Sequence, residues 1–146
     1  MKILFVVNEL NFFMRNHLNL AKSIRMHHEV ELIADVSKSN EESIYKLKQA
    51  GINLHILNRN TKINKGMSYL SFIFYLLKII RKNKPDYVLY ITLELSFFGS
   101  LISYFLSIKK SIFIITGLGP FFFKKEFKYR VLINYNKSIV LYCSHS

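Results

Sequence analysis

Two glycines late in the chain have the type and spacing of a small ligand-binding turn. The backbone N–H groups of Gly117-Leu118-Gly119 could point toward a phosphate or a sugar hydroxyl, or the segment could be only a tight turn. A dinucleotide fingerprint would need a third glycine where Phe122 stands, and a place after the first strand. The lysine of a Walker motif is also missing. The glycine pair by itself therefore predicts no nucleotide site.

Few side chains could serve as an acid, a base or a ligand. Glu94 is the one acid at the end of the fourth predicted strand, where it could bind acceptor hydroxyls, act as a base or belong to a helix cap. His17 lies on an apolar helix face, where a packed, hydrogen-bonded histidine is the commoner role. His27 and His28 are adjacent and point apart, so they form no metal pair. We therefore predict no metal site and no cofactor.

The elements that must position these residues alternate between strand and helix. Continuous apolar runs predict buried strands over residues 2–7, 29–34, 52–57, 86–92, 111–116 and 138–143. Helical spacing predicts helices over residues 11–24, 39–50, 67–84, 94–108 and 124–135. This order predicts an α/β fold, a Rossmann-like doubly wound domain with a mostly parallel sheet of about six strands.

Several residues mark where the predicted helices begin and end. Asn11 is expected to cap the first helix, and the segment around Asn40 opens the second. Gly51 closes the second helix at its C′ position, and Pro85 stops the third. These signals favour short, separate helices between the strands.

Residues 87–108 form a segment that is long and apolar enough to span a bilayer, so a transmembrane helix is one alternative. Glu94 lies inside this segment, where a carboxylate is costly. The alternation of Val88, Tyr90 and Thr92 is also typical of a strand. A strand followed by a helix is therefore the favoured interpretation.

Ligands of an open parallel sheet bind beyond the carboxyl ends of its strands, where the strand order reverses. Three predicted loops meet this description, at residues 8–12, 92–96 and 116–122. We therefore expect the functional residues of the domain to lie in these loops.

The chain is strongly basic, with 21 Lys and Arg against 9 Asp and Glu and a formal net charge of +12. This charge suits nucleic acid, an anionic membrane or phosphorylated small molecules, although an AT-rich genome gives the same composition. No helix-turn-helix, RRM or zinc-finger pattern is present, so no nucleic-acid partner is predicted. The cations lie beside the most apolar segments, which suits a membrane surface better.

Residues 121–130 interleave four phenylalanines and a tyrosine with four cations. Such a basic aromatic segment could lie at a membrane interface, or its phenylalanines could cover the edge of the sheet. The residues predicted for a membrane interface are Phe121, Phe122, Phe123, Lys124, Lys125, Lys128 and Arg130.

The 146 residues have room for one domain, expected to span residues 1–146. One cysteine, Cys143, excludes a disulfide framework and a Cys-based zinc site, and fits a reducing compartment. The apolar run after Met1-Lys2 is too short for a signal peptide. We expect a cytoplasmic protein, which the basic aromatic segment would place peripherally at the inner face of the plasma membrane.

Several segments, in order, resemble family 4 glycosyltransferases, the retaining GT-B enzymes of polysaccharide assembly. The last of them, Ile115-Thr116-Gly117-Leu118-Gly119, is typical of a bacterial capsule and O-antigen subgroup. Together they extend over essentially the whole chain. The resembling segments are residues 2–8, 12–13, 20–22, 50–52, 83–88 and 115–119.

The resemblance implies the N-terminal acceptor domain of a hexosyltransferase-type enzyme. Such an enzyme transfers a sugar from a nucleotide-sugar donor to a lipid-linked or glycan acceptor and generally needs no metal. By carry-over, Asn8 and Phe12 would line the interdomain cleft, and Thr116, Gly117 and Gly119 would sit near the transferred sugar. The family often has a histidine where this chain has Asn16, so the neighbouring His17 receives no role from the resemblance.

The family's donor-binding second domain, with its pair of glutamates, has no counterpart in these residues. The resemblance therefore implies that the chain alone is inactive, as a truncated product or as half of a split enzyme completed by a partner chain. Two other functions stay open. One is a non-catalytic, membrane-associated module that binds anionic lipid through the basic aromatic segment, and the other is a small nucleotide-binding protein on a Rossmann scaffold.

Overall fold

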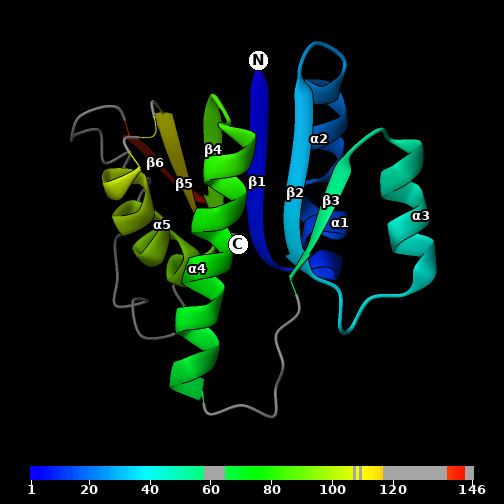
Figure 1. Ribbon diagram of the computed structural model, residues 1–146. Helices are drawn as coiled ribbons and strands as arrows, with labels where there is room; N and C mark the ends of the chain where they lie inside the picture. Colours follow the sequence, from blue (N-terminus) through cyan, green and yellow to red (C-terminus); the bar gives the residue numbers. More distant parts are fainter. Residues whose placement is uncertain (58–64, 107, 109, 117–137, 144–146) are drawn as a thin grey trace, which may run out of the picture.

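The computed structural model of the chain describes residues 1–57, 65–106, 108, 110–116 and 138–143, which form a parallel sheet with helices on both faces (Figure 1). The sheet has six strands in the order β3-β2-β1-β4-β5-β6, and every neighbouring pair is parallel. The strands are β1 (Lys2–Glu9), β2 (Glu29–Asp35), β3 (Asn53–Leu57), β4 (Tyr87–Ile91), β5 (Lys110–Thr116) and β6 (Ser138–Cys143). The predicted α/β, Rossmann-like fold is confirmed.

Five helices connect these strands within the described residues. Their bounds are α1 (Leu10–Asn16), α2 (Leu18–Arg25), α3 (Glu41–Gln49), α4 (Lys65–Asn83) and α5 (Leu93–Phe105). Asn40 caps α3, since its side chain accepts a hydrogen bond from the Ser43 N–H, and Gly51 follows the helix with a φ of 67°. Both end signals of this helix were visible in the sequence. The helix predicted over residues 124–135 lies outside the described residues.

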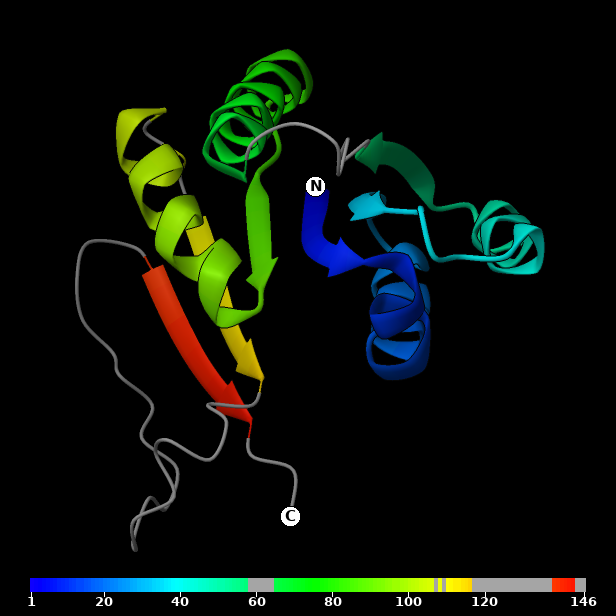
Figure 2. The same cartoon turned by 90° about the horizontal axis from the view of Figure 1, so that it is seen from below.

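The core has two halves, one on each face of the sheet. Successive side chains of a strand point to opposite faces, so Phe5 and Val7 of β1 pack with residues of α1, α2 and α3. Leu4 and Val6 pack instead with residues of α4 and α5. Figure 2 shows α4 and α5 on one side of the sheet, with α1 and α2 on the other.

The strand order reverses between β1 and β4, the two central neighbours. From β1 the chain moves outward through β2 to β3, then returns by α4 to β4 on the other side of β1. In an open parallel sheet this reversal leaves a crevice at the carboxyl ends of the two strands. The topology therefore directs attention to the residues that follow β1 and β4.

The single helix predicted over residues 11–24 is wrong in two respects. The structure has two helices, because His17 lies between α1 and α2 with a backbone φ of −126°. The cap predicted at Asn11 is also wrong, since α1 begins at Leu10 after Glu9. The side-chain amide of Asn11 donates instead to the carbonyl of Lys38, in the loop after β2, at 2.8 Å.

The apolar segment 87–108 contains β4 and α5 rather than one long helix. None of the helices in the described ranges has both the length and the apolar character that a membrane span requires. The favoured interpretation, a strand followed by a helix, is therefore the one that the structure has.

A close contact fixes α5 against β4. A Cβ atom added to Gly99 would lie 2.4 Å from Cδ1 of Tyr90, so the helix approaches the ring at a distance that only glycine permits. Tyr90 is fully buried, and its hydroxyl accepts a hydrogen bond from Ser103 of α5 at 3.2 Å. Burial raises the pKa of Tyr90 to about 12. This packing holds the middle and the second half of α5 against β4.

Candidate functional site

A polar cluster formed by Asn8, Thr92 and Glu94 lies at the carboxyl ends of β1 and β4, where the strand order reverses. Asn8 lies near the end of β1, Thr92 directly follows β4, and Glu94 is in the first turn of α5. Nδ2 of Asn8 lies 3.2 Å from Oγ1 of Thr92 and 3.3 Å from Oε2 of Glu94. The structure thus brings together two residues that the sequence placed in separate loops, Asn8 and Glu94.

Thr92 joins the strand to the helix in a strained conformation. Its φ is 116° and its ψ is 155°, a region that is essentially restricted to glycine and costs other residues about 1–3 kcal/mol. Its backbone N–H donates to the carbonyl of Ile114 on β5 at 3.0 Å, and its own carbonyl accepts from Oγ of Ser96 at 2.8 Å. These contacts fix the turn, and the turn directs the first residues of α5 toward Asn8.

The two oxygens of the Glu94 carboxylate have different surroundings. Oε2 accepts the hydrogen bond from Asn8, whereas Oε1 is buried and has no hydrogen-bond partner within the described part of the chain. Buried carboxylate oxygens are normally hydrogen-bonded, so an unsatisfied one calls for an explanation. The free acceptor on Glu94 fits a ligand that donates a hydrogen bond, such as a sugar hydroxyl.

Glu9, Asn11 and Lys38 form a second polar group at the same edge of the sheet, in which the members bind one another. Nζ of Lys38 lies 2.9 Å from Oε1 of Glu9, and Asn11 donates to the Lys38 carbonyl. The ion pair raises the pKa of Lys38 through its hydrogen bond and charge interaction with Glu9. This group ties the loop after β2 to the start of α1.

Phe12 lies in α1, on the other face of the sheet from α5. Its ring is half-buried, packs against the core beneath α1 and lies 5.6 Å from the ring of His17 between centroids. No described contact joins Phe12 to Asn8 or Glu94. Its expected place in an interdomain cleft stays a prediction.

His17 is a packed residue between the two short helices. It is 9% exposed, lies against the rings of Phe12 and Phe13, and has a buried Nε2 atom without a hydrogen-bond partner among the described residues. Burial lowers its pKa below the usual 6.5, so the ring is neutral near pH 7. The packed role expected for His17 agrees with this environment, although one ring nitrogen is unpaired rather than hydrogen-bonded.

The remaining predicted site residues lie at or beyond the limit of the described chain. Thr116 ends β5 and is paired in register with Cys143 of β6, but its side chain is not described. Gly117, Gly119 and the whole basic aromatic segment, residues 121–130, lie outside the described residues. Among the side chains that are described, no cluster of three or more His, Cys, Asp or Glu could hold a metal ion.

A comparison with models of protein families shows to which family this chain belongs. A model described as "Glycosyl transferase 4-like" matches residues 2–144, which is nearly the entire sequence. The chain belongs to this family. As a glycosyl transferase 4-like protein, it has the Rossmann-like N-terminal domain of GT-B glycosyltransferases.

Solved structures share the fold of this glycosyl transferase 4-like domain. MurG from Acinetobacter baumannii superposes with a TM-score of 0.60 at 15% identity over 78% of this chain and 34% of its own. A glycosyltransferase from Rickettsia africae gives 0.58 at 21% identity, over 78% and 29% of the two chains. The Glycyrrhiza uralensis protein UGT73P12, solved with glycyrrhetinic acid 3-O-monoglucuronide, gives 0.55 at 13%, over 80% and 28%.

The chain spans about a third of the length of these structures. At such identities the likeness shows the fold, so substrates do not carry over from it. No curated protein matches the sequence.

Thr92 is the site residue that the sequence did not single out. It was included in the loop 92–96, but no role was assigned to it. Its position at the end of a predicted strand, shortly before a predicted helix, is the usual place of a helix N-cap, which was the available signal. The positive φ could not be read from the residue type, because threonine rarely adopts it.

Proposed function

We propose that this glycosyl transferase 4-like domain binds the acceptor in the transfer of a sugar from a nucleotide-sugar to a lipid-linked or glycan acceptor. The proposed process is the synthesis of a surface polysaccharide, of the capsule or O-antigen type. The observation that carries the proposal is the unsatisfied Glu94 oxygen beside Asn8 at the strand-order reversal. Family membership supplies the reaction class, and the cluster supplies a place for the acceptor.

The proposed role of Glu94 is to accept a hydrogen bond from an acceptor hydroxyl. Charged acceptors form hydrogen bonds about twice as strong as neutral ones, which suits a carboxylate for holding a sugar. Asn8 fixes the other oxygen of Glu94, so the carboxylate is oriented before the ligand arrives. The strained turn at Thr92 is consistent with this role, since such strain concentrates at functional sites.

The donor site is proposed to lie in a second domain. The chain spans about a third of the glycosyltransferase structures that share its fold, which leaves room there for donor contacts outside the part matched here. We propose that this second domain acts either in the same polypeptide or as a partner chain. By this proposal, the 146 residues alone transfer no sugar.

Binding of acceptor analogues tests the role of Glu94. Alkyl glycosides combine sugar hydroxyls with an apolar tail, so they serve as probes for a lipid-linked acceptor in titrations followed by NMR. The substitution Glu94→Gln keeps the shape of the side chain and removes its charge. We expect it to weaken binding by about tenfold, because hydrogen bonds to a charged group contribute about 1.5–3 kcal/mol against about 1 kcal/mol for neutral ones.

A matched control is available on another helix. Glu41 lies in the first turn of α3, as Glu94 lies in the first turn of α5, so Glu41→Gln has the same effect on a helix dipole. The control should leave glycoside binding unchanged. Equal binding by wild type and Glu94→Gln would contradict the acceptor role, and tight binding of a UDP-sugar by the isolated chain would contradict a separate donor domain.

A further inference from the structure

Three polar side chains from three different elements meet on the α4 side of the sheet. Oε2 of Glu31 on β2 lies 3.0 Å from Nε2 of His55 on β3. Nδ2 of Asn83, the last residue of α4, lies 2.5 Å from the same oxygen and 3.1 Å from the same nitrogen. The three atoms therefore form a closed triangle, and we call these three residues the Glu31 cluster.

The alternation of side chains along the strands brings Glu31 and His55 onto one face. Glu31 and Ile33 are two positions apart on β2, and Ile33 is the register partner of His55, so all three point the same way. Ile33 packs in the half of the core that includes α4. Glu31 is only 5% exposed, so a carboxylate occupies a position that faces an apolar core. A charge is retained at such a position only with partners that compensate its burial.

Hydrogen bonds alone cannot satisfy all three contacts of the cluster while Glu31 is ionised. An ionised carboxylate oxygen only accepts, and Nε2 of a histidine either donates or accepts. If Nε2 donates to Glu31, it faces the donor amide of Asn83, and if it accepts from Asn83, it faces the acceptor oxygen of Glu31. Turning the amide of Asn83 over brings its oxygen against the oxygen of Glu31 instead. In each arrangement one contact joins two like groups.

A metal cation removes this conflict, because it attracts three lone pairs at once. With the amide of Asn83 turned over, the lone pairs are those of a carboxylate oxygen, an imidazole nitrogen and an amide oxygen. A triangle of this size leaves room for an ion about 2 Å from each atom, the length of zinc bonds to nitrogen and oxygen. An imidazole ligand favours zinc over magnesium or calcium. The side chain of His55 is 30% exposed, so solvent can reach the cluster and supply a fourth ligand.

Lys2 and Glu29 give the surroundings of the cluster a charge that suits a cation. Nζ of Lys2 lies 3.3 Å from Oε1 of Glu31 and 3.3 Å from Oε1 of Glu29, so one ammonium group lies between two carboxylates. One negative charge is left to balance a cation. Lys2 also binds the oxygen of Glu31 that does not face His55, and such outer partners commonly orient the ligands of a metal.

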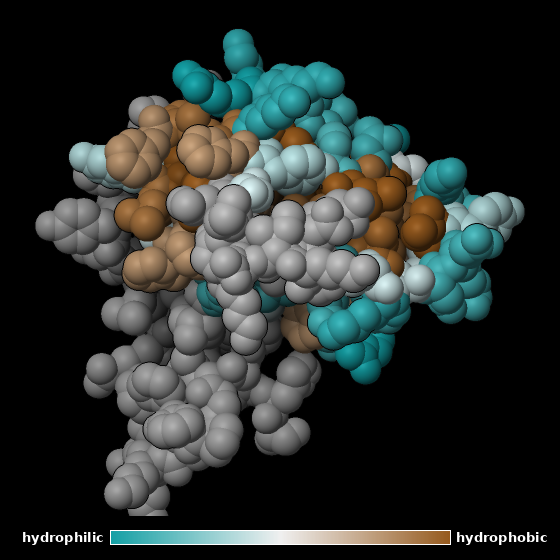
Figure 3. All heavy atoms as spheres, turned by 60° about the horizontal axis from the view of Figure 1, so that its bottom comes forward, coloured by the Kyte–Doolittle hydropathy of each residue, from teal (hydrophilic) through white to brown (hydrophobic). Residues whose placement is uncertain are grey.

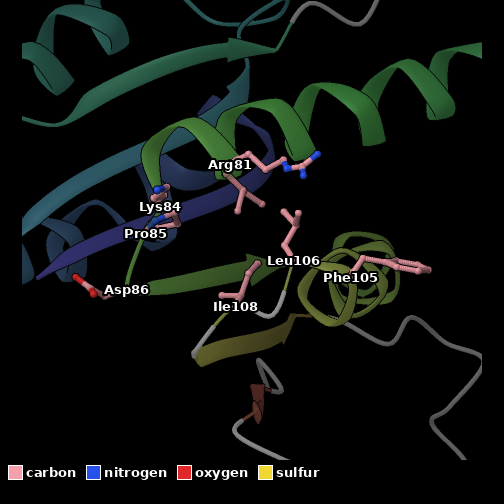
Figure 4. A pocket seen from close by; sticks show the side chains of 8 residues that line it. Arg81, Lys84, Pro85, Asp86, Phe105, Leu106 and Ile108 are labelled. Carbon is pink, nitrogen blue, oxygen red and sulfur yellow. The ribbon is translucent and has the colours of Figure 1, made fainter.

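Two neighbouring surfaces suit a cation less well. The hollow between the ends of α4 and α5 is lined by Arg81 and Lys84, whose charges repel a cation (Figure 4). Asp86 also lines this hollow, but its carboxylate accepts a hydrogen bond from the backbone N–H of Lys2 at 2.8 Å. Figure 3 shows apolar residues gathered over α5, and these supply no ligand atoms. The Glu31 cluster is therefore the better candidate.

We propose that Glu31, His55 and Asn83 bind a zinc ion in a structural site. The site joins β2 and β3 to the end of α4, the helix by which the chain returns from β3 to β4. It differs from the sequence prediction of no metal site because its ligands are 24 and 52 positions apart and include an amide. The proposal is independent of sugar transfer, since Glu31 pairs in register with Leu4 of β1, well before Asn8.

Titration of the full chain with zinc chloride, measured by isothermal titration calorimetry, tests the site. We expect one ion per chain, and we expect zinc to raise the thermal midpoint of unfolding, because it binds the folded state. His55→Gln removes the nitrogen ligand at a partly exposed position, and Glu31→Gln removes the charge but keeps the shape of the side chain. Each should weaken zinc binding about 100-fold or more, since loss of an outer partner alone costs about 10–100-fold.

A control separates this site from adventitious binding to surface histidines. His27 and His28 lie directly before β2, and the double variant His27→Gln with His28→Gln should bind zinc as wild type does. Magnesium chloride should neither bind nor compete, because magnesium prefers a set of oxygen ligands. If Glu31→Gln lowers the stability of the fold, His55→Gln still gives the result: zinc should leave its thermal midpoint unchanged.

Three results would overturn the proposal. One is the absence of zinc binding by the wild-type chain, which would identify the Glu31 cluster as a hydrogen-bonded link only. Another is loss of binding in the double variant of His27 and His28 together with full binding in His55→Gln. The third is binding as strong as wild type in both His55→Gln and Glu31→Gln.

Discussion

The amide of Asn8 lies 3.3 Å from the carboxylate of Glu94, although the two residues are 86 positions apart in the sequence. The contact joins the end of β1 to the first turn of α5, across the point at which the strand order reverses. One oxygen of Glu94 is thereby fixed, and the other is buried without a hydrogen-bond partner among the described residues. The cluster is therefore both a structural link and the proposed acceptor contact.

The substitution Asn8→Asp tests the electrostatics of this link. It would place a second carboxylate beside Glu94, and the repulsion should raise the pKa of one of the two groups above its unfolded value. Stability is then retained at about pH 4, where the proton is held, and lost as the pH rises through the raised pKa. We expect an additional loss on the order of 1–2 kcal/mol at about pH 7, measured by urea unfolding at both pH values.

The control for this experiment is Asn8→Ala, which removes the same hydrogen bonds without adding a charge. Its loss of stability should depend on pH much less than that of Asn8→Asp, because it places no second carboxylate beside Glu94. Parallel pH profiles for Asn8→Asp and Asn8→Ala would show that the carboxylate of Glu94 is not close enough to interact.

The strain at Thr92 can be measured with a pair of substitutions. Thr92→Ala and Thr92→Gly both remove the hydroxyl that accepts hydrogen bonds from Asn8 and from the Leu95 N–H. Only glycine relieves the φ of 116°, so Thr92→Gly should be more stable than Thr92→Ala by about 1–3 kcal/mol. The free energies of unfolding from chemical denaturation give this difference.

The same pair of substitutions at Asn40 provides the reference. Asn40 also caps a helix, but its φ of −88° is in the ordinary extended region. The difference between Asn40→Gly and Asn40→Ala therefore reports the cap alone, about 1 kcal/mol or less. If the difference at Thr92 were no larger than that at Asn40, no backbone strain would be stored in the turn.

The order of strands and helices could be predicted because its signals are local. Apolar runs such as residues 2–7 and end signals such as Gly51 depend on neighbouring residues only. The break at His17 was missed because Phe13, His17 and Ala21 continue the helical spacing through it. Asn11 was misassigned because its partner, the Lys38 carbonyl, is distant in sequence.

The candidate site could be predicted only in part. The rule that ligands bind at the carboxyl ends of parallel strands placed Asn8 and Glu94 at one edge of the sheet. Their direct contact depends on β1 and β4 being neighbours, which follows from the strand order and not from either segment alone. The sequence could not predict that one oxygen of Glu94 lacks a hydrogen-bond partner, because this depends on the packing around a single atom.

Gly99 provides a test of the packing that positions α5. Alanine is usually better than glycine in a helix by about 1 kcal/mol. At this position its Cβ would lie 2.4 Å from the Tyr90 ring, so we expect Gly99→Ala to destabilise the protein by about 1–3 kcal/mol. Thermal or urea unfolding measures the change. Ser100→Ala, at the exposed neighbouring position, should be neutral or slightly stabilising, and equal behaviour of the two variants would contradict the close approach.

The buried His17 predicts a dependence of stability on pH. Because burial lowers its pKa, the unfolded chain takes up a proton near pH 6.5 before the folded chain does. Stability is therefore fully present above about pH 6.5 and falls as the pH is lowered toward the folded pKa, by at most about 1.4 kcal/mol per pH unit. His17→Leu removes this proton uptake together with the unpaired Nε2 atom, so it should flatten the profile at little cost near neutral pH. The measurement is the free energy of urea unfolding between about pH 5 and 7. The control His27→Leu, at an exposed position, should keep the wild-type dependence of this free energy on pH. An unchanged dependence in His17→Leu would mean that His17 is protonated in the folded state as readily as in the unfolded one.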